Sequence, residues 1–262
     1  MFELQNNKEI PLLRVNAHVY KHSSFGCTHL HLDCDSTEKA FSVAFRTIPK
    51  DHTGIAHILE HTVLCGSEKF PVRDPFFMMT RRSLSTFMNA MTYPDITAYP
   101  FATLNDKDFS NLLLVYLDAA FFPNIDELDF MQEGHRFDFV KNDKSKDQIV
   151  LKGIVHNEMK GAMSSISSQA DQGLNENLFP NHTYGYNSGG DPQDIPKLTY
   201  QNLLEFHTKH YHPSNAIFFT YGKTDIPALQ NEIQINVLKH FSPSTEKIEV
   251  KESKPSEIQN TL

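Results

Sequence analysis

The run His57-Ile58-Leu59-Glu60-His61 constrains this chain most, because it places two imidazoles and a carboxylate within five residues. On a helix, positions four apart lie one turn apart on the same face, so both histidines can reach one metal ion. Glu60 projects from the same side and would stand beside that metal. Zinc binds imidazole readily and leaves a position open for water when three protein groups bind it. The spacing therefore predicts a zinc-binding helix with a base beside it, a combination suited to amide hydrolysis.

The residues around this motif indicate a helix buried on most sides. Small and apolar residues lead into it from Thr53 to Ala56 and follow it from Thr62 to Ser67. Two histidines and a glutamate are costly to bury in such a helix unless they bind something. The alternative of two ordinary helix histidines with a surface glutamate stays open, because 14 histidines make a chance match a real risk.

Secondary-structure patterns predict an α+β fold, in which helices pack on a mostly antiparallel sheet. Residues 1–242 form the expected domain, and the polar residues 243–262 are expected to be a tail or the start of an interdomain linker. Strands are expected at 12–21, 28–33, 40–47, 216–221, within 87–104 (interrupted by Pro94 and Pro100) and as a hairpin within 137–151. Helices are expected around His57 and at 76–84, 105–121, 124–135, 153–177, 198–211 and 226–241.

Several blocks together make the sequence resemble the pitrilysin/insulinase family of zinc metallopeptidases, with the greatest likeness to its presequence-protease branch. The order H-x-x-E-H is the signature of the inverzincins. The resemblance implies a single pitrilysin-type metallopeptidase domain, the N-terminal catalytic domain of such an enzyme. The further blocks, in family order, are 64–71, 74–76, 87–95, 97–100, 132–134, 157–161, 188–192 and 211–216.

The resemblance also implies roles for single residues. His57, His61 and Glu158 would bind zinc, although Glu158 lies 97 residues after His61, a separation that cannot be interpreted from spacing alone. Glu60 would be the general base. The residues implied in substrate binding, on an edge strand that pairs with extended peptide, are Asn89 and Ala90.

The chain departs from the family in two ways. Many members carry a further glutamate seven residues before the third ligand, where this chain has Leu151. Full-length members have four domains in two halves that close around a chamber, and an arginine and a tyrosine of the second half help to bind substrate. A second half or partner domain is therefore expected, whether the chain is a piece cut at a domain boundary or a natural half-enzyme.

The expected function is that of a zinc-dependent endopeptidase that degrades short unfolded peptides, as the catalytic domain of a larger chambered protease. The alternative is a non-catalytic peptide-binding or partner subunit of a processing-peptidase-type complex. Relatives of that second type typically lose motif residues, whereas this chain keeps all four.

Composition bounds the partners and the compartment. A net charge of −8 argues against nucleic acid, and the absence of a long apolar run argues against a membrane span. Three scattered cysteines fit a reducing compartment. The first residues show no leader pattern, so we expect a bacterial cytoplasm, or the mitochondrial matrix if a transit peptide has been trimmed. Two other histidine groups, His29/His31 and His207/His210/His212, are interpreted as packing residues rather than metal ligands.

Overall fold

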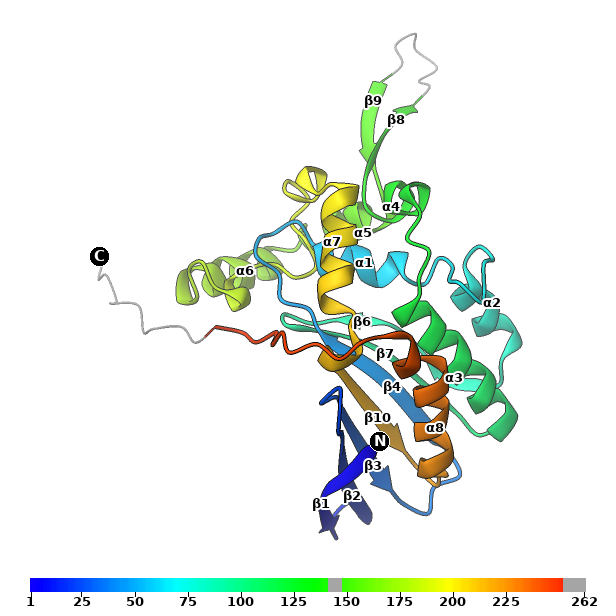
Figure 1. Cartoon of the computed structure of the whole chain (residues 1–262). Helices are drawn as coiled ribbons and strands as arrows, with labels where there is room; N and C mark the ends of the chain where they lie inside the picture. The colour runs from blue at the N-terminus through cyan, green and yellow to red at the C-terminus, as the bar shows by residue number, and fades with distance from the viewer. Residues whose placement is uncertain (141–147, 252–262) are drawn as a thin grey trace.

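The computed structural model describes residues 1–140 and 148–251 and shows an α+β fold, as predicted (Figure 1). An eight-stranded sheet has the order β1-β2-β3-β10-β4-β7-β5, with β6 also paired to β7. Every pairing in it is antiparallel except that of β3 with β10. Its strands are β1 (Phe2–Ile10), β2 (Val15–His22), β3 (Thr28–Asp33), β4 (Lys39–Arg46), β5 (Ser85–Met88), β6 (Met91–Thr92), β7 (Ile96–Thr103) and β10 (Ala216–Tyr221).

Some helices cover this sheet, and others lie at its upper end in Figure 1. α3 and α8 pack together against one face, and α1 packs against α4, α7 and the strands β6 and β7. A separate hairpin, β8 (Arg136–Val140) with β9 (Gln148–Lys152), projects from the body. The helices are α1 (Ile55–Thr62), α2 (Pro75–Arg82), α3 (Asp106–Phe121), α4 (Glu127–Glu133), α5 (Ile154–Ala162), α6 (Ile166–Leu178), α7 (Tyr200–His210) and α8 (Ile226–Asn236).

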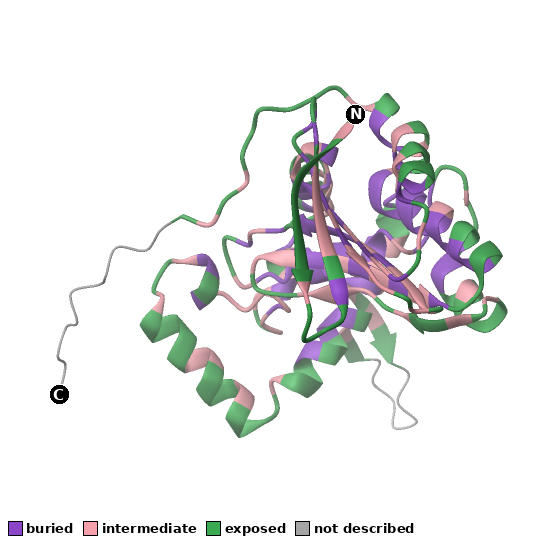
Figure 2. Ribbon diagram, turned by 90° about the horizontal axis from the view of Figure 1, so that it is seen from below, coloured by how far each residue is buried: buried purple, intermediate pink, exposed green. Residues whose placement is uncertain are grey.

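The core lies between the central strands and the helices that cover them, as the buried residues in Figure 2 show. Every second residue of β7 is buried, among them Tyr99 and Phe101, so this strand has the two-residue period of a sheet with one face on the core. Phe101 lies opposite Phe41 of β4, and both side chains are fully buried. Burying one such side chain stabilises the fold by about 1.5–3 kcal/mol. These central strands therefore give a rigid base for the residues at their edge.

Pro100 does not interrupt its strand, contrary to the prediction. β7 runs through it, and its carbonyl oxygen accepts a hydrogen bond from the Asn89 N–H at 3.1 Å. In an antiparallel strand the N–H and C=O of one residue point the same way, so the missing N–H also faces Asn89 rather than β4. The ladder to β4 loses no hydrogen bond, which is why this proline is tolerated inside the strand.

Two other predictions about the elements were wrong. β1 was not expected, and the single helix predicted over 153–177 is two helices, α5 and α6, separated at 163–165. Ser164 lies in this break and donates its hydroxyl to the carbonyl of Gly161 at 2.6 Å. Serine side chains compete for backbone hydrogen bonds in this way, and they favour helix ends over helix interiors.

The C-terminal part of the described chain carries no helix or strand after the 3-10 turn Leu238–His240. Residues 243–251 of the predicted tail are in this region, and 252–262 lie outside the described residues. The division at 242 stays a prediction. Within the described residues, no helix has the length and apolar character needed to cross a bilayer.

Candidate active site

α1 carries both histidines of the motif on one side. Their ring centroids are 5.0 Å apart, as expected for positions one turn apart. The residues on the other side, Ala56, Ile58 and Leu59, are completely buried and fix the helix in the core. His57 and His61 therefore project from a helix that has little freedom to move.

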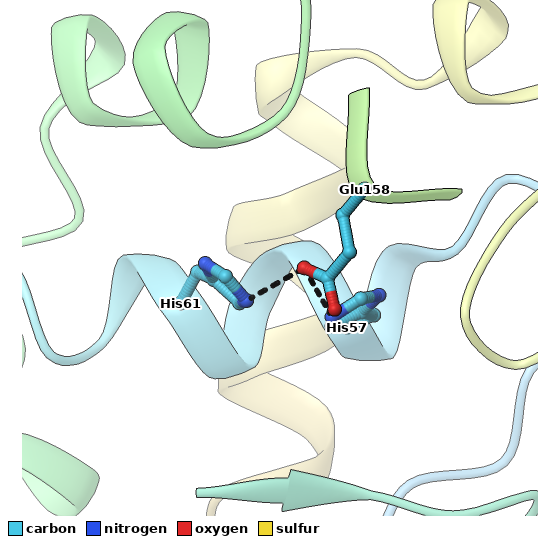
Figure 3. A group of neighbouring side chains, drawn as sticks. All are labelled: His57, His61 and Glu158. Carbon is cyan, nitrogen blue, oxygen red and sulfur yellow. Dashed lines mark ion pairs between the residues drawn. The ribbon is translucent and has the colours of Figure 1, made fainter. Parts of the chain in front are cut away.

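Glu158 of α5 completes a group of three possible metal ligands (Figure 3). Its Oε2 lies 3.7 Å from Nε2 of His57 and 3.8 Å from Nε2 of His61. Ligand atoms around a tetrahedral zinc ion are about 3.3 Å apart, so a small side-chain adjustment would bring these three into place. Two imidazoles and one carboxylate are also a donor set that catalytic zinc uses. The residues present therefore fit a zinc ion.

Each histidine is held through its second ring nitrogen. The Nδ1 of His57 donates to the carbonyl oxygen of Gly189 at 3.0 Å, and the Nδ1 of His61 donates to Oε2 of Glu133, also at 3.0 Å. Since a carbonyl oxygen can only accept, the proton of His57 belongs on Nδ1. The lone pair on Nε2 then points toward Glu158. Such outer contacts orient metal-binding imidazoles and fix their tautomer.

The electrostatics at His61 are dominated by two opposing effects. Burial lowers the pKa of His61, but the hydrogen bond to Glu133 and the charges of Glu60, Glu133 and Glu158 raise it, and the net pKa is raised. A cation at this position is therefore favoured, whether it is a proton or a metal ion.

Glu60 is buried beside the histidines, and its Oε2 accepts a hydrogen bond from Oγ1 of Thr92 at 2.6 Å. Thr92 belongs to β6, the short strand that follows Asn89 and Ala90. The carboxylate that the sequence assigns as the general base is thus anchored to the strand next to the predicted peptide-binding segment.

Asn89 and Ala90 lie between β5 and β6, on the outer side of β7, so they are at the edge of the sheet but in a break rather than within a regular strand. Both line a cleft of about 610 Å³ that also reaches His57, Glu60 and Glu158. They also line an adjoining cavity of about 160 Å³. The structure therefore brings all six predicted site residues to one cleft.

Comparison with known proteins identifies the family. The sequence model of the family described as "Insulinase (Peptidase family M16)" matches residues 46–168, and that of the family described as "Peptidase M16 inactive domain" matches residues 197–261. The mitochondrial presequence protease of Xenopus tropicalis is 49% identical over 97% of this chain, and that of Danio rerio is 52% identical over 89%. The chain belongs to peptidase family M16. Its likeness to these relatives places it in the presequence-protease branch.

This M16 chain spans about a quarter of the length of these relatives, 24% and 23% respectively. Solved structures agree with the fold. The crystal structure of pitrilysin has a TM-score of 0.71 and 18% identity, covering 97% of this chain and 26% of its own. A protease from Helicobacter pylori has a TM-score of 0.69 and 16% identity, covering 91% of this chain and 53% of its own. At these identities the likeness concerns the fold alone.

Three residues that contact the site were not singled out as functional from the sequence of this M16 chain. Thr92, Glu133 and Gly189 were each noted only as part of a block of the family resemblance. Position 151, where many members have a glutamate, carries Leu151 of β9, which lies opposite Phe137 in the hairpin. The acidic group that contacts His61 through Nδ1 is Glu133 of α4.

The other histidine groups of this M16 chain make packing contacts. His29 and His31 point the same way, and each forms a hydrogen bond with Oγ1 of Thr220 at 2.9 Å. His210 stacks on Phe206, with ring centroids 3.8 Å apart. Within residues 1–140 and 148–251, His57, His61 and Glu158 are the one group of three or more His, Cys, Asp or Glu side chains placed to share a metal ion.

Proposed function

We propose that this chain is the catalytic domain of a zinc-dependent endopeptidase that degrades short unfolded peptides. One observation carries the proposal: the possible ligand atoms of His57, His61 and Glu158 lie within 4.8 Å of one another, on a cleft that also contains Glu60. Membership of a peptidase family supports this assignment. The relatives' printed name, presequence protease, supports a peptide substrate.

The chemistry follows from what each residue can do. A zinc ion held by His57, His61 and Glu158 would polarise the carbonyl of the scissile bond and lower the pKa of a water molecule. Glu60 accepts the proton of the attacking water and delivers it to the leaving amine. Thr92 holds this carboxylate toward the cleft, so that Glu60 needs little reorganisation during turnover.

The edge of the sheet suits an extended peptide. Asn89 is exposed and Ala90 half-buried in the break between β5 and β6, beside the cleft that holds the metal-binding group. Pairing through the main chain binds a peptide with little regard to its side chains. A folded protein presents few free strands, so this mode of binding selects unfolded segments.

The alternative function is that of a non-catalytic peptide-binding or partner subunit in a processing-peptidase-type complex. The convergence of all four motif residues on one cleft favours the enzyme, because a subunit without catalysis has no need of Glu60. A second half or partner domain closing the chamber belongs to this proposal, since the chain spans about a quarter of its relatives. The names of those relatives favour mitochondria over the bacterial cytoplasm.

The proposal is tested by hydrolysis of a quenched fluorogenic peptide of about 10–20 residues, with and without chelator, together with zinc analysis. Cleavage that the chelator abolishes and about one zinc per chain are expected. Glu60→Gln should keep the zinc and lose the turnover. Hydrolysis by this variant at the wild-type rate would contradict the mechanism. Zinc without cleavage would require the same assay with the second half added, and continued inactivity there would favour the binding subunit.

A further inference from the structure

Glu133 is a buried carboxylate in direct contact with a predicted zinc ligand. It is the last residue of α4, and only 6% of its surface is exposed. Its Oε2 accepts the hydrogen bond from Nδ1 of His61 at 3.0 Å, and its Oε1 accepts one from the Gln132 side chain at 2.9 Å. Both oxygens are therefore held, and the one nearer the site faces His61.

The two histidines differ in what holds them. His57 donates to the main-chain oxygen of Gly189, which is neutral, whereas His61 donates to a carboxylate. A hydrogen bond to a charged acceptor is stronger than one to a neutral acceptor, and it increases electron density on the opposite ring nitrogen. His61 is also the more exposed of the two, with 24% of its side chain exposed against 11% for His57. The stronger contact thus falls on the histidine with less packing around it.

Among the described residues, Glu133 forms no direct ion pair with a cation other than His61. Among the described residues, its hydrogen-bond and ion-pair partners are His61 and Gln132. Most of the charges near this end of α4 are carboxylates: burial raises the pKa of Asp129, and the charges of Asp126, Asp74 and Glu133 raise it further, while Arg73, which donates to the Gln132 side chain rather than to Glu133, lowers it. A buried charge in such a place is costly unless an opposite charge offsets it. A metal ion on the far side of the His61 ring would offset it.

We propose that Glu133 is a positioning residue for the metal centre, which holds His61 as the Nδ1–H tautomer with Nε2 directed at the ion. This rests on the proposed zinc function but concerns a residue outside the motif and outside the set of ligands. Glu133 lies 72 residues after His61 and reaches it because the end of α4 packs on α1. A Cβ added at Gly134, the next residue, would lie 3.2 Å from Ile58 of α1, so the two helices meet closely at this point.

The test measures zinc affinity and tautomer rather than hydrolysis. Zinc Kd is measured by competition with a chromogenic chelator for the wild type, Glu133→Gln, Glu133→Leu and Asp129→Asn. Asp129→Asn is the matched control, because it removes a nearby negative charge from α4 without touching His61. The ring tautomer of His61 is read from long-range ¹H–¹⁵N NMR spectra of the metal-free chain at a pH where the imidazole is neutral.

The wild type should show the Nδ1–H tautomer alone, and Glu133→Leu a mixture of both tautomers. Zinc Kd should rise about 10–100-fold in Glu133→Leu, as is usual for loss of such an outer contact. Glu133→Gln, which keeps an acceptor oxygen and the shape, should raise Kd less but measurably. Asp129→Asn should stay within about twofold of the wild type.

The proposal is overturned if the Kd of Glu133→Leu stays within twofold of the wild type and its tautomer is unchanged. Should Glu133→Leu fail to fold, Glu133→Gln decides, and an unchanged Kd in that variant has the same meaning. Peptide hydrolysis enters neither measurement. A wild-type chain that binds no zinc would contradict the proposed function, while the tautomer in the metal-free chain would still decide the role of Glu133.

Discussion

His57 and Gly189 are joined across 132 residues of sequence by one hydrogen bond, 3.0 Å from the imidazole Nδ1 to the main-chain oxygen. The loop that carries Gly189 reaches α1 because Gly54, at the start of the helix, has no side chain. A Cβ at Gly54 would lie 2.7 Å from both the oxygen of Gly189 and the Cα of Gly190. Gly54 also has φ +67°, a conformation that side chains disfavour. The orientation of His57 thus depends on the absence of one side chain three residues before it.

Gly54→Ala should therefore both destabilise the chain and weaken metal binding. The left-handed backbone and the clash with the 189–190 loop together should lower the free energy of unfolding by about 2 kcal/mol or more. Gly173→Ala is the matched control, because Gly173 lies inside α6 with nothing within 4 Å of an added Cβ. That control should raise the free energy of unfolding by about 0.5–1 kcal/mol. Urea unfolding of the metal-free chains measures the free energy of unfolding of both variants. Equal stabilities of Gly54→Ala and the wild type would refute the packing argument.

Thr92→Val should reduce turnover without loss of zinc. The substitution keeps the shape of the side chain but removes the hydroxyl that donates to Glu60 at 2.6 Å. With the base less firmly held, we expect kcat to fall about tenfold, which corresponds to about 1.4 kcal/mol in the activation barrier. Thr92→Ser should restore most of the rate. A Thr92→Val enzyme with wild-type kcat would show that this hydrogen bond does not help catalysis.

Ala90→Phe should act on the peptide rather than on the metal. Ala90 lines both the larger cleft and the smaller adjoining cavity, so a bulky ring there would fill space along the edge of the sheet. We expect KM for a 10–20-residue peptide to rise by about tenfold or more, which is about 1.4 kcal/mol of lost binding. The zinc content should stay at the wild-type level. An unchanged KM would place the peptide elsewhere.

Acid should destabilise the fold well before the carboxylates titrate. Burial lowers the pKa of His29 to about 3 and those of His207 and His210 to about 4, against an ordinary value of 6.5. Below pH 6.5 the unfolded chain binds protons that the folded chain does not, so stability falls as the pH falls. Each such histidine should cost about 2 kcal/mol at pH 5.

The urea midpoint of the metal-free chain, measured from pH 7.5 to pH 5, tests this expectation. His29→Gln removes one titrating group, so its midpoint should fall less steeply over the same range. Identical slopes for the wild type and the variant would mean that His29 is not buried in its neutral form.

The helix that carries His57 and His61 and most of the strands could be predicted from the sequence, because their signals are local. α1 follows from the spacing of His57 and His61 among apolar residues, and β4 and β7 follow from alternation. β1 escaped prediction because it is exposed along almost its whole length. It is held by main-chain pairing with β2, and main-chain pairing leaves no pattern in the side chains.

The outer contacts of the site could not be predicted for a related reason. Gly189 acts through its carbonyl oxygen, which every residue has, and Glu133 comes from a different helix 72 residues away. Only the packing of α4 and of the 189–190 loop on α1 shows these contacts. The proposed third ligand, Glu158, was predicted through resemblance to the family, since no physical rule fixes its distance from His61 in the sequence.

These groups are far apart in the sequence, so they become available one after another as the chain is synthesised. The histidines are made early, Glu133 and Glu158 follow later, and Gly189 comes last of the groups that hold them. An emerging chain that ends before residue 158 has only two of the three proposed ligands, and one that ends before residue 189 leaves His57 without the carbonyl that accepts its hydrogen bond. Tight zinc uptake should therefore begin only after most of the domain has been synthesised and packed. A bound ion would then mark a finished domain, and a half-made chain would carry no active centre.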